Sequence, residues 1–173
     1  MTIKAQRATI EYVEGITVDG YMMPNGEFRV GMVGASLALG YAENWLYRLT
    51  NRGGKTLKAL QGIGYTGLPL DAELDPVNGG GTKATTISLS DWQRLKIYAA
   101  QQGKMKAVAL LAYQSLSSDA DLFTDAFALP RWTVEQKRAM YCAELAKDMN
   151  WLEEDRKDWR VIEEQEMFLL SLS

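Results

Sequence analysis

Gly40 divides a stretch of small and large apolar residues that extends from residue 33 to residue 52. Apolar side chains recur at helical spacing on both sides of this glycine, at Ala35, Leu39, Leu46 and Leu49. Glycine accepts the left-handed backbone conformation that ends one helix and redirects the chain into the next. The pattern therefore predicts two short helices joined at Gly40, each with one buried face.

The sizes of the side chains around Gly40 match those of a helix-turn-helix. A twenty-residue frame that begins at Met32 places Gly40 at the turn. The positions where the two helices cross then hold small residues, Ala35 and Ser36. We expect the second helix over residues 42–51. An ordinary helical hairpin has the same size pattern and remains the alternative.

The outward side chains of the expected second helix are of the kinds that bind DNA. Asn and Arg can each make two hydrogen bonds to the edge of adenine or guanine, so Asn44 and Arg48 are candidate base readers. Residues 44–70 contain four cations and no Asp or Glu, and the cations after Arg48 are candidates for phosphate contacts. The sequence thus predicts a DNA-binding surface made of Asn44, Tyr47, Arg48, Asn51, Arg52, Lys55 and Lys58. The alternative is a basic face that contacts only water.

Strand signals precede the helix pair. Ala8, Ile10 and Tyr12 alternate with polar neighbours, and Glu14-Gly15 then signals a turn. Asn25-Gly26 lies between two apolar runs and is a strong hairpin signal, because both residues tolerate positive φ. We expect these segments to form a small antiparallel sheet.

The rest of the chain is predicted to be mainly helical. Residues 71–82 are rich in Asp, Asn and Gly and predict a loop, whereas the β-branched residues 83–89 predict a strand. Helices are expected from Ser90-Asp91 onward, with breaks at Gly103 and Pro130. The predicted fold class is α+β, with a small antiparallel β-hairpin sheet followed by a helix-turn-helix and a mainly helical C-terminal half.

The charge pattern divides the chain near Pro130. We predict an α+β DNA-binding domain over residues 1–130 and a helical, acidic extension over residues 131–173. Thr133 and Gln136 have the spacing of a capping box, which predicts a helix start. The extension could pack on its own chain, form a dimer or bind a partner protein through an apolar stripe that includes Trp151, Trp159 and Ile162.

Two segments resemble the amino-terminal domains of phage antirepressors, the BRO-N and KilA-N groups. Leu39-Gly40-Tyr41 follows the strand hairpin, and residues 89–95, with the sequence LSDWQRL, follow a later strand, as in those domains. The resemblance extends over residues 16–115. It implies a DNA-binding regulator of phage or mobile-element type. Because helix-turn-helix readers usually bind paired half-sites, we also expect a homodimer.

Carboxylates near the hairpin leave an enzymatic alternative open. Asp19 lies on one expected strand, and Glu27-Phe28-Arg29 begins the next. Nucleases of the PD-(D/E)xK type hold Mg²⁺ between an acid on one strand and an acid-x-lysine on its neighbour. Here Arg29 stands in the place of that lysine. Asp19 and Glu27 are candidate metal ligands under this alternative alone.

The composition argues against several classes of site. The chain has no histidine and a single cysteine, Cys142, which excludes Ser-His-Asp triads and the usual zinc sites. No apolar run approaches the roughly 18 residues of a membrane span, and the N-terminus lacks a signal-peptide stretch. We therefore expect a cytoplasmic protein that has DNA as its partner and uses no cofactor and no membrane. A protein-binding module acting through residues 131–173 is the second function class that the sequence leaves open.

Overall fold

The computed structural model describes residues 3–74 and 83–140. The chain divides into two compact units, Met1–Trp132 and Thr133–Ser173. In the described ranges no helix combines the length and the apolar character that a membrane crossing requires.

The described part of the second unit begins with the predicted capping box. Thr133 N donates to Gln136 Oε1 (2.8 Å), and Gln136 N donates to Thr133 Oγ1 (3.1 Å). Residues 134–140 are helical, so the predicted helix start is confirmed. The other features predicted for this extension lie outside the described residues: Cys142, Trp151, Trp159 and Ile162.

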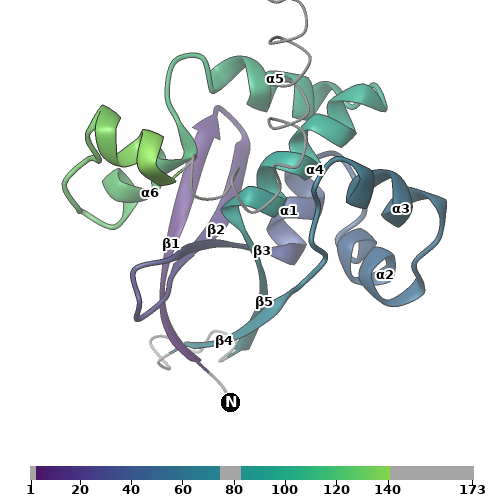
Figure 1. Cartoon of the computed structure of the whole chain (residues 1–173), viewed down its shortest axis with the longest axis horizontal. Coiled ribbons are helices and arrows are strands. Elements are labelled where there is room, and N and C mark those ends of the chain that lie inside the picture. The colour runs from purple at the N-terminus through teal and green to yellow at the C-terminus, as the bar shows by residue number, and fades with distance from the viewer. Residues whose placement is uncertain (1–2, 75–82, 141–173) are drawn as a thin grey trace, which may run out of the picture. The chain divides into compact units, whose positions relative to one another are not determined.

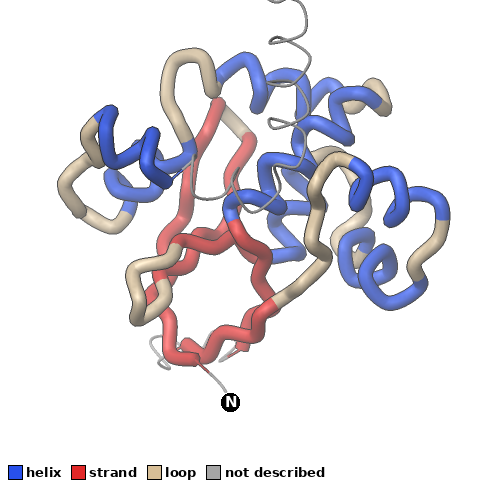
Figure 2. The backbone as a smooth tube through the Cα atoms, viewed as in Figure 1, coloured by secondary structure: helices blue, strands red, loops and turns tan. Residues whose placement is uncertain are grey.

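Five strands of the first unit close into a barrel in the order β1-β2-β3-β5-β4 (Figure 1). Figure 2 shows the strands as a closed ring. Neighbouring strands are antiparallel, except that β1 and β4 are parallel. The strands are β1 (Ile3–Val13), β2 (Ile16–Met22), β3 (Phe28–Gly31), β4 (Leu70–Leu74) and β5 (Lys83–Ser88).

Both expected hairpins are present. Strands β1 and β2 pair up to Val13 and Ile16, on either side of the turn at residues 14–15. Between β2 and β3, Gly26 has a φ of 82° and its N–H donates to Met23 O (2.9 Å). The Asn25 side chain accepts a hydrogen bond from Glu27 N (3.0 Å) and holds this turn. The local signals for the first three strands are therefore confirmed.

The predicted small hairpin sheet is wrong, because the three strands do not remain open. An open sheet would leave unpaired N–H and C=O groups along β1 and β3. Residues much later in the chain satisfy them: Ile3 pairs with Ala72 of β4, and Val30 pairs with Ile87 of β5. Strand β4 falls in the segment predicted to be a loop. Its Ala72 is fully buried. The acidic residues on either side of Ala72 make the segment look polar, so the sequence gives no clear strand pattern there.

Six helices accompany the barrel in the described part of the first unit. Helices α1 to α3 lie between β3 and β4 in the sequence, and α4 to α6 follow β5. In Figure 1, α2 and α3 lie on one side of the barrel and α6 on the other. The bounds are α1 (Met32–Ala38), α2 (Trp45–Arg52), α3 (Lys55–Gly62), α4 (Leu89–Gln101), α5 (Met105–Tyr113) and α6 (Asp119–Ala126).

The helix pair around Gly40 forms, but its connection is longer than predicted. Helix α1 ends at Ala38, and Gly40 follows its C-cap with a φ of 84°. Two hydrogen bonds close this end, from Gly40 N to Leu37 O (3.0 Å) and from Tyr41 N to Ser36 O (2.9 Å). The chain then makes a second turn before α2 begins at Trp45, three residues later than expected. Trp45 N donates to Ala42 O (2.9 Å) in this turn, and the rings of Tyr41 and Trp45 stack across it, with centroids 3.8 Å apart and planes at 4°, which stabilises the longer connection.

The start of α4 also differs from the prediction. The sequence predicts a helix start at Ser90-Asp91. In the structure Ser88 is the N-cap, and its side chain accepts a hydrogen bond from Asp91 N (3.1 Å). Asp91 is fully buried and accepts hydrogen bonds from the N–H and the hydroxyl of Thr66, both at 2.7 Å. Its carboxylate thus fixes the segment between α3 and β4, a contact 25 residues away in the sequence.

Candidate nucleic-acid interface

Helix α2 separates its side chains into a buried and an exposed side. Leu46 and Leu49 are buried in the core, as the helix-pair pattern predicts. Successive residues turn by about 100° in an α-helix, which places the exposed residues on one arc of about 140°. That arc consists of Asn44, Tyr47, Arg48, Asn51 and Arg52.

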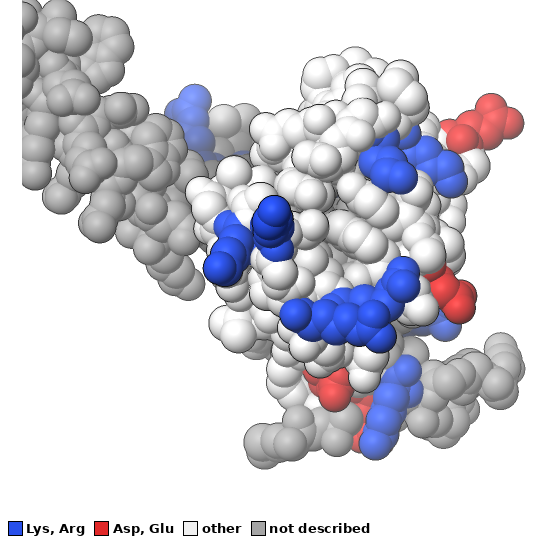
Figure 3. Space-filling view, turned by 90° about the vertical axis from the view of Figure 1, so that its right-hand side faces the viewer, with Lys and Arg blue, Asp and Glu red and all other residues white. Residues whose placement is uncertain are grey.

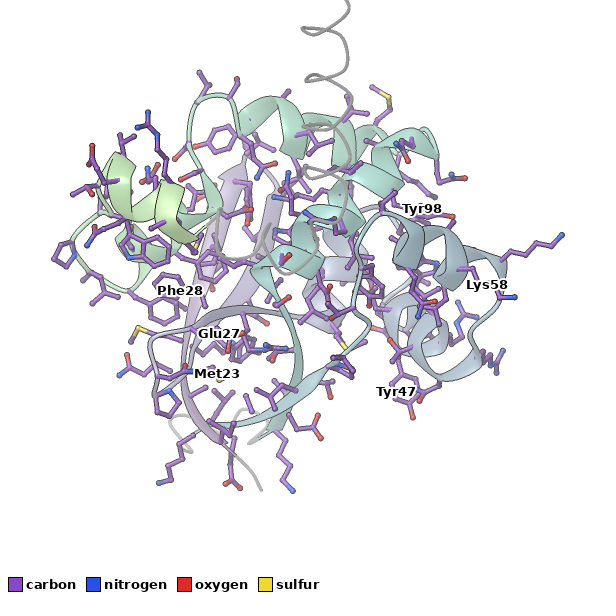
Figure 4. All side chains as sticks on the ribbon, viewed as in Figure 1. Met23, Glu27, Phe28, Tyr47, Lys58 and Tyr98 are labelled. Atoms are coloured by element: carbon purple, nitrogen blue, oxygen red, sulfur yellow. The ribbon has the colours of Figure 1, made fainter. Side chains whose placement is uncertain are left out.

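Helix α3 continues this surface with two lysines. Gly53 and Gly54 separate it from α2, and Leu60 anchors it in the core. Lys55 and Lys58 are exposed. Figure 4 shows Lys58 extending away from α3, and Tyr47, in the first turn of α2, below it. We call the seven exposed residues of the two helices the α2 face: Asn44, Tyr47, Arg48, Asn51, Arg52, Lys55 and Lys58.

The cations of the α2 face are not neutralised by neighbours. Within the described ranges their side chains make no ion pair and no hydrogen bond. Figure 3 shows this side of the molecule, where Lys and Arg side chains are spread over the surface and acidic side chains lie toward its margins. Four cations elsewhere each lie within 3.0 Å of a carboxylate oxygen: Arg7, Arg29, Lys96 and Arg131.

The two asparagines of the α2 face differ in their contacts. Asn44 is the N-cap residue of α2, yet its side chain makes no capping hydrogen bond. Asn51 donates its side-chain N–H to Tyr47 O (2.9 Å), so its own helix occupies one of its donors. Asn44 is therefore the asparagine whose amide is available to an external group.

Contacts that the sequence pattern does not reveal hold the start of α2 in place. Lys104 lies 4.6 Å from the centre of the Tyr41 ring, and its ammonium donates to Gly40 O (3.3 Å). Tyr41 in turn stacks on Trp45, the first residue of α2. Burial raises the pKa of the Tyr41 hydroxyl, with Tyr98 as a second cause. No local signal could identify Lys104, because 64 residues separate it from Gly40.

A cleft of about 510 Å³ adjoins the α2 face. Its walls come from β2, the end of β3, β5, the start of α1 and the start of α2, and it includes Asn44 and Tyr47. The acids Asp19 and Glu43 and the cation Lys83 also line it. The sequence does not indicate this cleft, since its residues come from segments far apart in the chain.

The carboxylates of the enzymatic alternative are not brought together. Asp19 accepts two hydrogen bonds from Arg7 (2.9 and 3.0 Å), and Glu27 accepts one from Arg29 (2.6 Å). Met23 N donates to Glu27 O (2.9 Å), so Glu27 lies opposite Met23. Asp19 is four residues earlier on β2, about 13 Å along the strand. In the described ranges no three His, Cys, Asp or Glu residues cluster as a metal site would require.

Arg29 has a structural role in place of the metal-site lysine. It is buried and donates to Thr86 Oγ1 (2.9 Å) and Thr86 O (3.3 Å). These bonds connect β3 to β5 and help to close the barrel.

The molecule also contains a buried ion pair, between Lys96 and Asp119. Both carboxylate oxygens of Asp119 accept from Lys96 (3.0 and 2.9 Å), and one also accepts from the Tyr12 hydroxyl (2.7 Å). Burial lowers the pKa of the Lys96 ammonium, and the neighbouring carboxylate opposes this shift. Because the pair is covered by protein, we assign it to the packing of α4 and α6 on β1.

No family model, no curated protein and no solved structure matches this chain. The resemblance to phage antirepressor domains therefore stays a prediction.

Proposed function

We propose that the first unit binds DNA through the α2 face. The observation that carries this proposal is a set of exposed cations that have no ion-pair partner among the described residues. They lie beside Asn44, whose side chain makes no capping hydrogen bond, on one side of a helix pair that is anchored in the core. Cations that fold-stabilising ion pairs do not use are available to phosphates, which supply most of the affinity of proteins for DNA.

The positions of the residues favour two roles. Asn44 and Arg48 lie one helical turn apart on the same side of α2, and their side chains match adenine and guanine edges. Arg52, Lys55 and Lys58 lie toward the end of α2 and on α3, where they would meet the phosphate backbone. The role predicted for Asn51 becomes secondary, because this residue bonds to its own helix.

The dimensions of α2 are compatible with groove reading. An α-helix with its side chains is about 10–12 Å in diameter, close to the width of about 12 Å of the major groove of B-DNA, and the eight residues of α2 extend about 12 Å along such a groove. The N-terminus of α3 has neither an acidic residue in its first turn nor a side-chain cap. Its free N–H groups, beside Lys55, would add to phosphate binding.

The biological role that we infer is that of a DNA-binding regulator of phage or mobile-element type, acting in the cytoplasm as a homodimer. Dimerisation would present two α2 faces to paired half-sites. Residues 131–173 are the candidate segment for dimerisation or for a protein partner, and most of them lie outside the described residues.

The test is a fluorescence-anisotropy titration of the full chain with a pool of random DNA duplexes. We expect binding at low salt, with log affinity falling against log salt with a slope of about −3, from three phosphate contacts. The double variant Arg48→Ala/Arg52→Ala should bind at least about tenfold more weakly. Arg131→Ala is the matched control, since this exposed arginine is paired with Asp125 and lies outside the α2 face. Absence of binding at low salt, or equal loss in the control, would refute the proposal.

A further inference from the structure

The cleft beside the α2 face has the size and the opening of a ligand site. Its volume of about 510 Å³ lies within the range of about 300–1,000 Å³ that small-molecule sites occupy. Its lining includes exposed residues from three different segments, Val33, Tyr47 and Lys83, so that its mouth is at the surface. It shares Asn44 and Tyr47 with the α2 face and therefore continues that surface inward.

Two glycines allow the backbone of α1 and β3 to form one wall of the cleft. A Cβ atom at Gly31 would lie 3.1 Å from the Tyr21 ring, and one at Gly34 would lie 3.4 Å from Asp19 N. Helix α1 thus starts in close contact with β2. The wall that results has few side chains, which leaves room for a flat molecule.

The side chains around the cleft suit a planar heterocycle with both donors and acceptors. The Tyr47 side chain is 65% exposed at the rim, where its ring can stack on a flat group. The Asn44 amide offers a donor and an acceptor, and Glu43 offers an acceptor for an exocyclic amine.

The charges of the cleft favour a neutral guest over a free anion. The charge of Asp19 is balanced by Arg7, whose guanidinium lies 2.9 Å from it. Glu43 and Lys83 carry opposite charges. A phosphate would find no cluster of cations here, whereas such a cluster is present on the adjoining α2 face.

We infer that this cleft accepts one unpaired base of the nucleic acid that is bound on the α2 face. The inference rests on the proposed function. A strand whose phosphates contact Arg52 and Lys58 at the C-terminal end of α2 can follow the helix for about 12 Å to its start, where the cleft opens beside Asn44 and Tyr47. A base within a duplex presents only its edge and cannot enter, so the occupant is an extrahelical or single-stranded base. A free nucleoside shares this chemistry, and the experiment separates the two sources.

The experiment measures the affinity of the full chain for three duplexes that are identical except at one position. One is fully paired, one carries a single extrahelical adenine, and one carries an abasic site there. Stacking of a base on an aromatic side chain corresponds to about 5- to 150-fold in affinity, so we expect the extrahelical adenine to bind tighter by a factor in this range. The abasic duplex should bind like the paired one.

Two matched variants on α1 locate the effect. Val33 is 58% exposed and lines the cleft, so Val33→Trp should fill it and abolish the preference, with affinity for the paired duplex unchanged within twofold. Leu37 is 48% exposed and lies one turn further along the same helix, outside this cleft, so Leu37→Trp should keep the preference.

The outcomes distinguish this inference from the proposed function. Equal affinity for all three duplexes, or a preference that survives Val33→Trp, overturns the inference and leaves DNA binding intact. Binding of none of the duplexes overturns both. Calorimetry with adenosine tests the other source. If adenosine binds, Val33→Trp abolishes this binding and the three duplexes bind equally, then the cleft accepts a free nucleoside, and the inference that it accepts a base of the bound strand is overturned.

Discussion

Ser36 of α1 accepts a hydrogen bond from the backbone N–H of Leu46 in α2, at 3.3 Å. The same hydroxyl donates to Met32 O, at 2.9 Å. Both residues are fully buried. Because Asn44 does not cap α2, this contact gives one of the first N–H groups of the helix its partner. The hydroxyl therefore positions the α2 face relative to the core.

Ser36→Ala should destabilise the protein by about 1–2 kcal/mol, because the Leu46 N–H would be buried without a partner. Urea unfolding measures the change. Ser115→Ala is the control, since its exposed hydroxyl, in the turn that follows α5, donates to Ala112 O three residues away, and it should change stability by less than about 0.5 kcal/mol. Equal effects of the two variants would show that the contact between α1 and α2 contributes little.

Asp119→Ala should destabilise the protein by about 3–5 kcal/mol, because it leaves the Lys96 charge buried without a partner. The double variant Lys96→Met/Asp119→Leu should recover most of this loss, since it removes both charges and keeps an apolar volume. The exposed pair of Asp125 and Arg131 provides a comparison, and Asp125→Ala should leave the unfolding midpoint nearly unchanged. If the double variant is no more stable than Asp119→Ala, the buried charge is not the cause.

Tyr65 should make stability fall at alkaline pH. Burial, with Asp91 as a second cause, raises the pKa of Tyr65 from 10.0 to about 12. Between pH 10 and 12 the folded protein keeps the Tyr65 proton, whereas the unfolded chain loses it. The contribution of Tyr65 to the free energy of unfolding is therefore complete below pH 10 and is lost as pH rises toward 12. The loss is about 1.4 kcal/mol per pH unit in that window.

Comparison of the native chain with Tyr65→Phe at pH 9 and pH 11 tests this expectation. The stability of the variant relative to the native chain should rise by about 1 kcal/mol between these values. Parallel behaviour of Tyr65→Phe and the native chain would contradict the assignment.

The two asparagines of the α2 face should respond differently to substitution. Asn44→Ala should lower affinity for a selected DNA site by about 5- to 150-fold, the effect of one bidentate base contact. Asn51→Ala should have a smaller effect, because its side chain bonds to Tyr47 O. Anisotropy with the selected site and with a random duplex measures both losses. A larger loss for Asn51→Ala would mean that this residue leaves its helix to read a base.

The amino-acid sequence by itself determined the features that depend on neighbours in the chain. Turn chemistry at Asn25-Gly26 and the helix end at Gly40 follow from backbone preferences of single residues. The burial of Leu46 and Leu49, and the exposure of Arg48 on the opposite side, follow from the helical period. Each of these requires only a few consecutive residues.

Only the tertiary structure decided the closure of the barrel, the longer connection before α2 and the cleft. Each depends on residues far apart in sequence: Ala72 pairs with Ile3, Lys104 packs on Tyr41, and Lys83 lines the cleft together with Asn44. A turn signal or an apolar period carries no information about such partners, because pairing between distant segments is selected by the free energy of the whole packed unit.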